Sequence, residues 1–190
     1  MRKMKLSGLI KKKTKTIIGI DYSLTSPAIC INNGNLMFFY LTSKKKWQCM
    51  MNETIVGYAH KEWTDPIQRF RQISDFAIDI IKDLYKPKVF IEGYSFGSKG
   101  QGLFQIAENC GILKYRLQEE NIPYETVVPS VVKKHATGKG NADKDKMYEA
   151  FVNETKIDLK KIFDTEKVGN PVSDIVDSYY IMKVGNAISV

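Results

Sequence analysis

The chain has 190 residues and a mass of 21.7 kDa, with 43% hydrophobic and 26% charged residues, which predicts one globular domain and excludes a disordered chain and a two-lobed enzyme. No apolar run approaches the roughly 20 residues that cross a bilayer, and lysines interrupt the stretch that an export signal needs, so we expect a cytoplasmic protein without a membrane partner. The formal net charge is +8, but residues 1–16 hold seven basic and no acidic side chains, which leaves 22 basic against 21 acidic side chains in the rest.

The basic segment 1–16 is expected to be a tail outside the globular domain, which we place at residues 17–190. Two interpretations of this tail remain open. It either makes sequence-independent contacts with DNA phosphates or is a solvated, disordered leader.

The first elements after the tail are predicted to be three strands. Residues 16–23 are rich in β-branched side chains and end in polar ones, and residues 28–31 and 36–41 form two further apolar runs. Asn33-Gly34 lies between the second and third runs and is a strong hairpin signal, because both positions tolerate positive φ. The chain is therefore expected to open with an antiparallel meander.

The segment 42–64 shows no clean periodicity and is predicted to be a loop or insertion. It carries Lys44-Lys45-Lys46 beside Trp47, which either touch nucleic acid or form a surface loop with one anchoring aromatic.

Helices and strands alternate after this segment. Asp65-Pro66 is an N-cap followed by proline, and apolar residues at helical spacing predict a helix over residues 66–85. A strand is expected at 88–92, a helix at 103–117, a strand at 124–128, a helix at 143–154 and a last helix after Pro171. The pattern predicts an α/β fold with a five-stranded mixed sheet, three antiparallel strands followed by two parallel ones, flanked by helices.

Four acidic residues occupy positions where folding does not require an acid. Asp21 and Glu92 each end an apolar strand, and Asp174 and Asp177 lie three residues apart on one face of the last helix. If the two strands are neighbours and the helix packs across them, the four carboxylates meet. Their repulsion becomes favourable when Mg²⁺ or Mn²⁺ ions bridge them. Two such ions can support hydrolysis of a phosphodiester bond.

Each acid taken alone has an ordinary structural explanation. Asp21 could cap a turn, Glu92 could pair with a lysine, and Asp174 could be a helix N-terminal acid favoured by the dipole. The set of four in this order favours the metal site.

The order of these elements resembles the RNase H-like superfamily and, within it, the RuvC family of Holliday-junction resolvases. The most specific match is residues 132–147, VKKHATGKGNADKDKM, which is similar to that family's V-K-x-x-x-x-G-x-G-x-A-x-K-x-x-(V/M) segment. Ile17-Gly19-Ile20-Asp21, Ile91-Glu92 and Asp174-x-x-Asp177 fill its other blocks. The high lysine content and small size of the chain resemble those of a bacteriophage member of this family.

The resemblance implies roles for individual residues. Asp21, Glu92, Asp174 and Asp177 would be catalytic residues that bind two Mg²⁺ (or Mn²⁺) ions, and Lys144 would be a further catalytic residue. The residues that would bind DNA are Lys133, Lys134, Lys139, Lys144, Tyr94, Phe96 and Lys99. Neither Tyr94 nor Phe96 has the family's usual spacing for its stacking aromatic, so each could also be a buried loop residue.

The resemblance also implies the activity and the partners. The chain would be a metal-dependent endodeoxyribonuclease that acts as a homodimer and resolves four-way junctions in DNA recombination and repair. The family dimerises through its central helix, here the apolar stripe from Leu103 to Leu117, although packing within one subunit would produce the same stripe.

Three rival functions remain. A flap or branched-DNA nuclease, or an RNase H, would keep the same fold and metal site, and a non-catalytic branched-DNA binding protein would keep the fold alone. Sugar kinases and actin-like ATPases also end their first strand in Asp, but 190 residues cannot supply their two lobes.

Overall fold

The computed structural model of the chain describes residues 14–94 and 101–188. Most of the basic tail, together with Phe96 and Lys99, lies outside these residues. Within them, no helix is long and apolar enough to cross a membrane.

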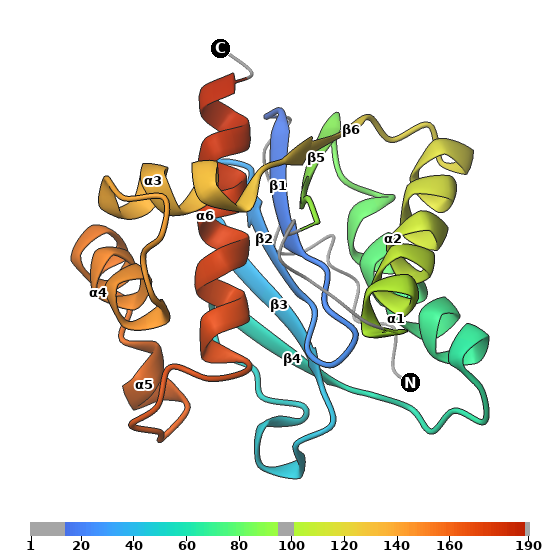
Figure 1. The fold of residues 1–190 in the computed structure, drawn as a ribbon, viewed down its shortest axis with the longest axis horizontal. Coiled ribbons are helices and arrows are strands. Elements are labelled where there is room, and N and C mark those ends of the chain that lie inside the picture. Colours follow the sequence, from blue (N-terminus) through green and yellow to red (C-terminus); the bar gives the residue numbers. More distant parts are fainter. Residues whose placement is uncertain (1–13, 95–100, 189–190) are drawn as a thin grey trace.

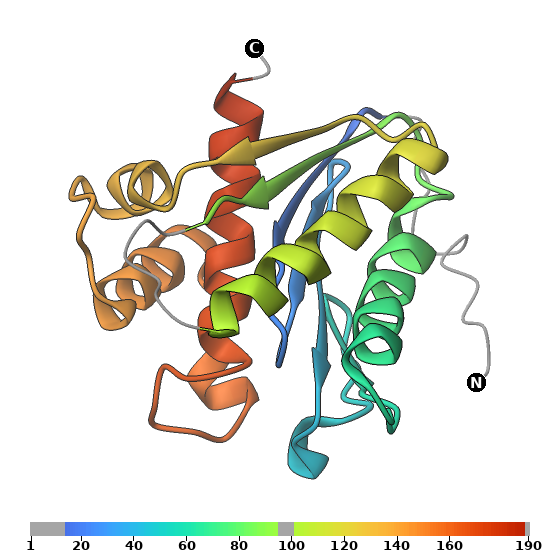
Figure 2. The same cartoon turned by 45° about the vertical axis from the view of Figure 1, so that its right-hand side comes forward.

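One mixed sheet forms the centre of the molecule, with α1 and α2 on one face and α3 to α6 on the other (Figures 1 and 2). The described residues form six strands in the order β4-β3-β2-β1-β5-β6. Their bounds are β1 Thr16–Asp21, β2 Ala28–Asn32, β3 Leu36–Thr42, β4 Ile55–Ala59, β5 Pro87–Glu92 and β6 Tyr124–Val127. The pairs β1–β2 and β2–β3 are antiparallel, whereas β1–β5, β5–β6 and β3–β4 are parallel. The predicted α/β class and the change from antiparallel to parallel strands are confirmed.

The prediction of five strands is wrong by one, because β4 lies inside the segment predicted to be a loop or insertion. β4 pairs with β3 in the register Tyr40↔Gly57 at the edge of the sheet. A short edge strand that contains a glycine has little alternation to detect. Gly57 is required here, because a Cβ at this position would come within 2.4 Å of the Tyr40 hydroxyl.

The helices agree with the predicted pattern and add three short elements, two α-helices and a 3₁₀ turn. Their bounds are α1 Pro66–Ile81, α2 Gln101–Glu119, α3 Pro129–Thr137, α4 Lys144–Thr155, α5 Leu159–Ile162 and α6 Val172–Ile188, with a 3₁₀ turn η2 at Lys45–Trp47. Helix α1 begins as predicted, because Asp65 accepts a hydrogen bond from the Gln68 amide at 2.9 Å. It ends at Ile81 and not at residue 85.

Two apolar cores, one on each face of the sheet, hold these layers together. Strand side chains alternate between them, so that Ile18 and Ile20 contact the α1–α2 layer while Phe38 and Tyr40 contact the α4–α6 layer. Helix α6 is buried on most sides because it lies directly on the sheet. This layer carries the last two of the four predicted acids to the sheet.

Candidate active site

The ends of two neighbouring strands bring the first two acids together. Strands β1 and β5 are parallel, and their paired residues Ile20 and Ile91 directly precede Asp21 and Glu92. Both acids therefore lie at the same edge of the sheet, as the sequence predicted.

Helix α6 brings the other two acids to this edge by an unusually close approach to β1. A Cβ on Gly19 would lie 2.2 Å from the Ser178 carbonyl oxygen and 2.3 Å from the Met182 amide nitrogen. Only glycine allows this contact, and Gly19 and Asp21 face the same side of the strand. Asp177 directly precedes Ser178, and Asp174 lies one turn earlier on the helix.

The electrostatics show that the four carboxylates interact. Burial raises the pKa of Asp21 well above its usual range, and the charges of Asp174, Asp177 and Glu92 raise it further. Burial raises the pKa of Asp177 to about 7, with Glu92 and Asp174 adding to the effect. Burial also raises the pKa of Asp174 to about 6, and that of Glu92 above its usual value. Burial thus disfavours the charged form of all four carboxylates, and mutual repulsion adds to this effect for Asp21 and Asp177.

Asp174 is only partly satisfied by its neighbours. Its side chain is buried, and the Ser173 hydroxyl lies 3.2 Å from its Oδ1. Ser173 has one proton to donate, and Asn170 Oδ1 competes for it at 3.2 Å. Asp174 Oδ2 is buried without a hydrogen bond of ordinary geometry, which is costly for a carboxylate oxygen, although the nearby Ser26 hydroxyl lowers the pKa of Asp174.

Lysines surround the carboxylates and lower the pKa of several of them. Lys144 acts on Asp21, Asp174 and Asp177, and its ammonium group donates to Ser173 Oγ at 3.2 Å. Lys133 acts on Glu92 and Asp177. Lys44, from the segment before β4, acts on Asp174. The sequence left open a nucleic-acid contact for Lys44 but did not relate it to the acids, and no local pattern relates Ser173 or Asn170 to them.

The donor set fits hard divalent cations. Four carboxylates, one with an unpartnered buried oxygen, are the ligands that Mg²⁺ and Mn²⁺ prefer. No three His, Cys, Asp or Glu side chains in the described ranges are already arranged around one point as ligands. The oxygen donors would therefore have to draw closer together to hold an ion.

The predicted DNA-binding residues are not all placed beside the acids. Lys134 and Lys139 are exposed on α3 and just after it, and the largest effects of lysine on the four carboxylates come from Lys44, Lys133 and Lys144 instead. Tyr94 is 43% exposed, and its hydroxyl donates to the Ala107 carbonyl of α2 at 3.5 Å.

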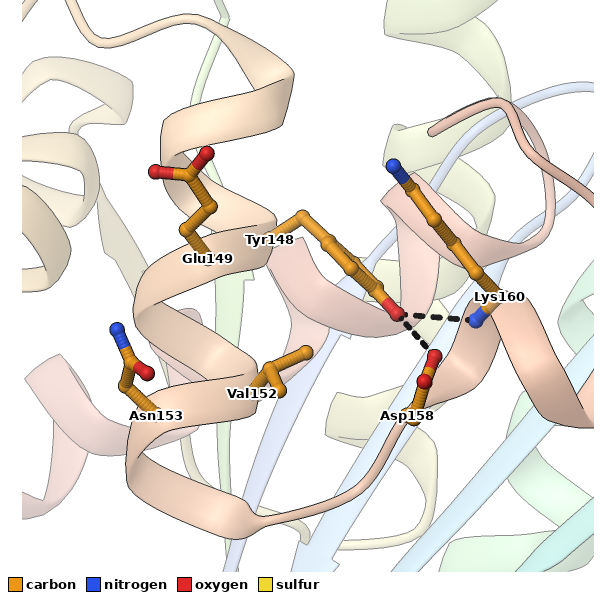
Figure 3. Close-up of a pocket in the computed structure, with 6 residues that line it drawn as sticks. All are labelled: Tyr148, Glu149, Val152, Asn153, Asp158 and Lys160. Carbon is orange, nitrogen blue, oxygen red and sulfur yellow. Dashed lines mark hydrogen bonds between the residues drawn. The ribbon is translucent and has the colours of Figure 1, made fainter.

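A cavity of about 340 Å³ between α4 and α5 is separate from this site (Figure 3). Its residues are Tyr148, Glu149, Val152, Asn153, Asp158 and Lys160. The Tyr148 hydroxyl donates to Asp158 Oδ1 at 2.7 Å and accepts from the Lys160 amide at 3.0 Å. These bonds join α5 to α4 and contribute no group to the carboxylate cluster.

The buried carboxylates predict a pH dependence of stability without divalent ions. An unfolded Asp releases its proton near 3.8, whereas folded Asp174 and Asp177 do so near about 6 and about 7. The folded state binds more protons in this window, so the free energy of unfolding is expected to fall as pH rises from 4 to 7. Asp177→Asn removes one buried charge and should raise the free energy of unfolding at pH 8 in EDTA by about 1 to 3 kcal/mol.

Urea denaturation in EDTA at pH 5 and pH 8 measures this effect. The exposed Asp79→Asn serves as the matched control and should change stability little at either pH. A stabilisation by Asp177→Asn that is equal at both pH values, or absent at pH 8, would contradict the expected charge repulsion.

Comparison with known proteins identifies the fold. No protein-family model matches the sequence. Among solved structures, the chain is similar to RuvC of Thermus thermophilus, at 14% sequence identity and a TM-score of 0.56 over 92% of this chain and 96% of that chain. The same protein in complex with a Holliday junction substrate matches at 13% identity and a TM-score of 0.58, over 91% of this chain and 94% of that chain. The fold is therefore the RNase H-like α/β fold, as predicted.

Proposed function

We propose that this chain is a metal-dependent endodeoxyribonuclease that resolves four-way DNA junctions by hydrolysing phosphodiester bonds. The observation that supports it most is the meeting of Asp21, Glu92, Asp174 and Asp177, from two strands and a helix, with lysines around them. The junction as substrate is supported by the likeness to RuvC, which has been solved with a Holliday junction.

The four carboxylates would hold Mg²⁺ or Mn²⁺ as a shared set of ligands for two ions. Bound ions of this kind activate water and stabilise charge on the phosphate. The work of the chain is to hold the acids on rigid elements. Asp21 and Glu92 are fixed by sheet pairing, and α6 is fixed by its contact with Gly19.

Lys144 and Lys133 would bind phosphate groups at the site. Their ammonium groups already interact with the acids, so a DNA strand that reaches the acids also reaches both lysines. A positive charge near the phosphate attracts the strand and stabilises charge that develops as the bond breaks. Lys134, Lys139 and Tyr94 would contact DNA farther from the cut.

The experiment that tests the function is cleavage of a 5′-labelled four-way junction, beside a linear duplex, a flap and an RNA–DNA hybrid, in Mg²⁺ and in EDTA. We expect paired nicks in opposing strands of the junction, in Mg²⁺ only. Cleavage of the flap or the duplex at the same rate as the junction would indicate a less selective nuclease and contradict a junction resolvase. Cleavage of the hybrid alone would indicate an RNase H. Binding without cleavage would contradict the nuclease activity and favour a non-catalytic branched-DNA binding protein.

A homodimer is part of the proposal, because two opposing strands must be cut. Part of the apolar stripe of α2 that was predicted to form the dimer interface lies inside the subunit. Cys110, Leu113 and Leu117 are buried in the core of the same chain. The other face of α2 exposes Phe104 by 68% and Tyr115 by 61%, and it crosses the front of the molecule in Figure 2. This exposed apolar face is the surface that a second copy would cover.

Phe104→Glu is expected to convert the dimer into a monomer that nicks one strand of a junction and not both. Sedimentation velocity measures the mass, and Ile67→Glu, at an exposed apolar residue of α1, is the matched control that should remain dimeric. A wild-type protein that is monomeric at micromolar concentration would contradict the proposed dimer. It would not contradict the nuclease activity, which the cleavage experiment tests separately.

A further inference from the structure

The connection between β3 and β4, residues 43–54, carries three consecutive lysines and Trp47, and the structure separates their roles. Trp47 is half-buried, and its Nε1 donates to the Phe163 carbonyl at 2.9 Å. Its ring packs edge-on against Phe163 at a centroid distance of 5.8 Å. Trp47 is therefore the anchor of this connection, and it is not free to stack on a base.

Further bonds hold the connection in one place. The buried Tyr40 hydroxyl donates to the Trp47 carbonyl at 2.6 Å, and Lys46 forms an ion pair with Asp164 at 2.9 Å. The Lys44 ammonium group lies 4.7 Å from the centre of the Trp47 ring. These contacts hold the backbone of the lysines in place before a ligand binds, which lowers the entropy cost of binding.

Lys44 reaches the start of the helix that carries two of the acids. Its Nζ donates to the Asn170 carbonyl at 2.7 Å, and Asn170 Oδ1 accepts from the Ser173 hydroxyl, which neighbours Asp174. In Figure 1 this connection is the cyan loop below the first turn of α6. Lys44 is therefore placed at the Asp174 end of the carboxylate cluster.

The lysines around the cluster differ in the acids that they face. Lys133 faces Glu92 and Asp177, Lys144 faces three of the acids, and Lys44 faces Asp174. Lys44 and Lys45 are exposed, and among residues 14–94 and 101–188 neither forms an ion pair, whereas Lys46 does. Lys44 thus adds a positive charge at the Asp174 end of the cluster, and the neighbouring Lys45 adds a second exposed one on the same connection.

We propose that Lys44 and Lys45 bind phosphate groups of the DNA strand that is cut, on the Asp174 side of the scissile phosphate. The inference rests on the proposed nuclease function and adds a second basic contact surface to it, supplied by the β3–β4 connection. Lys44 exchanges its bond to the Asn170 carbonyl for a phosphate oxygen, and Lys45 binds the next phosphate along the strand. Both are DNA-binding residues that position the strand.

The salt dependence of DNA binding tests this directly, because each phosphate contact releases condensed counterions. Junction binding is measured by fluorescence anisotropy in EDTA over a series of KCl concentrations, for wild type, Lys44→Gln, Lys45→Gln and Lys44→Arg. Each glutamine variant is expected to weaken binding about 3- to 10-fold and to reduce the slope of log K against log salt by about 1. Lys44→Arg keeps the charge and should retain the wild-type slope.

The control is Lys82→Gln at the C-cap of α1, the helix on the opposite face of the sheet (Figure 2). Lys82 is exposed and paired with Asp79, and its substitution should leave affinity and slope unchanged. A Lys44→Gln protein with a wild-type slope and affinity would overturn the inference while junction cleavage still upholds the nuclease. A loss of affinity with an unchanged slope and a lowered unfolding temperature would show a structural role instead. A wild-type protein that binds no DNA would overturn both.

Discussion

Replacing Asp21 with asparagine is expected to reduce junction cleavage by at least about 1000-fold, while junction binding in EDTA is retained. Asp21 interacts with every other acid of the cluster, since the charges of Asp174, Asp177 and Glu92 all add to the rise of its pKa. An asparagine keeps the shape of the side chain and removes the charge that divalent ions need. The loss should therefore appear in the rate of the chemical step and not in the affinity for DNA.

Single-turnover cleavage of a labelled junction at saturating protein measures this rate. Asp79→Asn on α1 is the matched control, since it removes an exposed carboxylate far from the cluster and should cleave at the wild-type rate. Full cleavage by Asp21→Asn would show that the four acids are not the catalytic centre. Equal losses of binding and cleavage would indicate that the substitution disturbs the fold.

Gly19→Ala is expected to lower the free energy of unfolding by about 3 kcal/mol or more. The added Cβ would lie 2.2 Å from the Ser178 carbonyl oxygen and 2.8 Å from the Met182 Cα. These are backbone atoms in the middle of α6, so no side-chain rotation relieves the overlap and the helix has to move away from β1. Because α6 carries Asp174 and Asp177, the same shift should also lower cleavage.

Urea denaturation measures the stability, with Gly102→Ala in α2 as the matched control. A Cβ on Gly102 would meet no atom within 4 Å, so this substitution should be neutral or slightly stabilising. If Gly19→Ala were as stable as the control, α6 could not pack on β1 as closely as the structure has it.

The sequence alone was sufficient for the fold class and for most elements, because these depend on local patterns. The Asn33-Gly34 hairpin, the Asp65-Pro66 helix start and the apolar strands that end in Asp21 and Glu92 are all encoded over a few residues. Helix α3 was also encoded locally, by Pro129 at its start and the left-handed Gly138 at its end, although no helix was predicted there.

Strand β4 and the role of α2 depended on partners that are distant in the sequence. Ile55–Ala59 becomes a strand by pairing with β3, and a five-residue edge segment carries no periodic signal of its own. The α2 stripe has helical spacing, but spacing does not say which neighbour covers each face. Leu113 and Leu117 contact the core of the same chain, while Phe104 remains exposed.

The sequence by itself indicated four acids as candidates for one site, since strand ends and a helix face are local properties. Their approach depends on the pairing of β1 with β5 and on the contact of α6 with Gly19, which are tertiary. Only the tertiary structure decided what surrounds them. Lys44, Ser173 and Asn170 reach the cluster through the anchored β3–β4 connection and the start of α6, segments that lie more than 100 residues apart. The packing that joins such segments is a sum of contacts over the whole fold, so no short stretch of sequence records it.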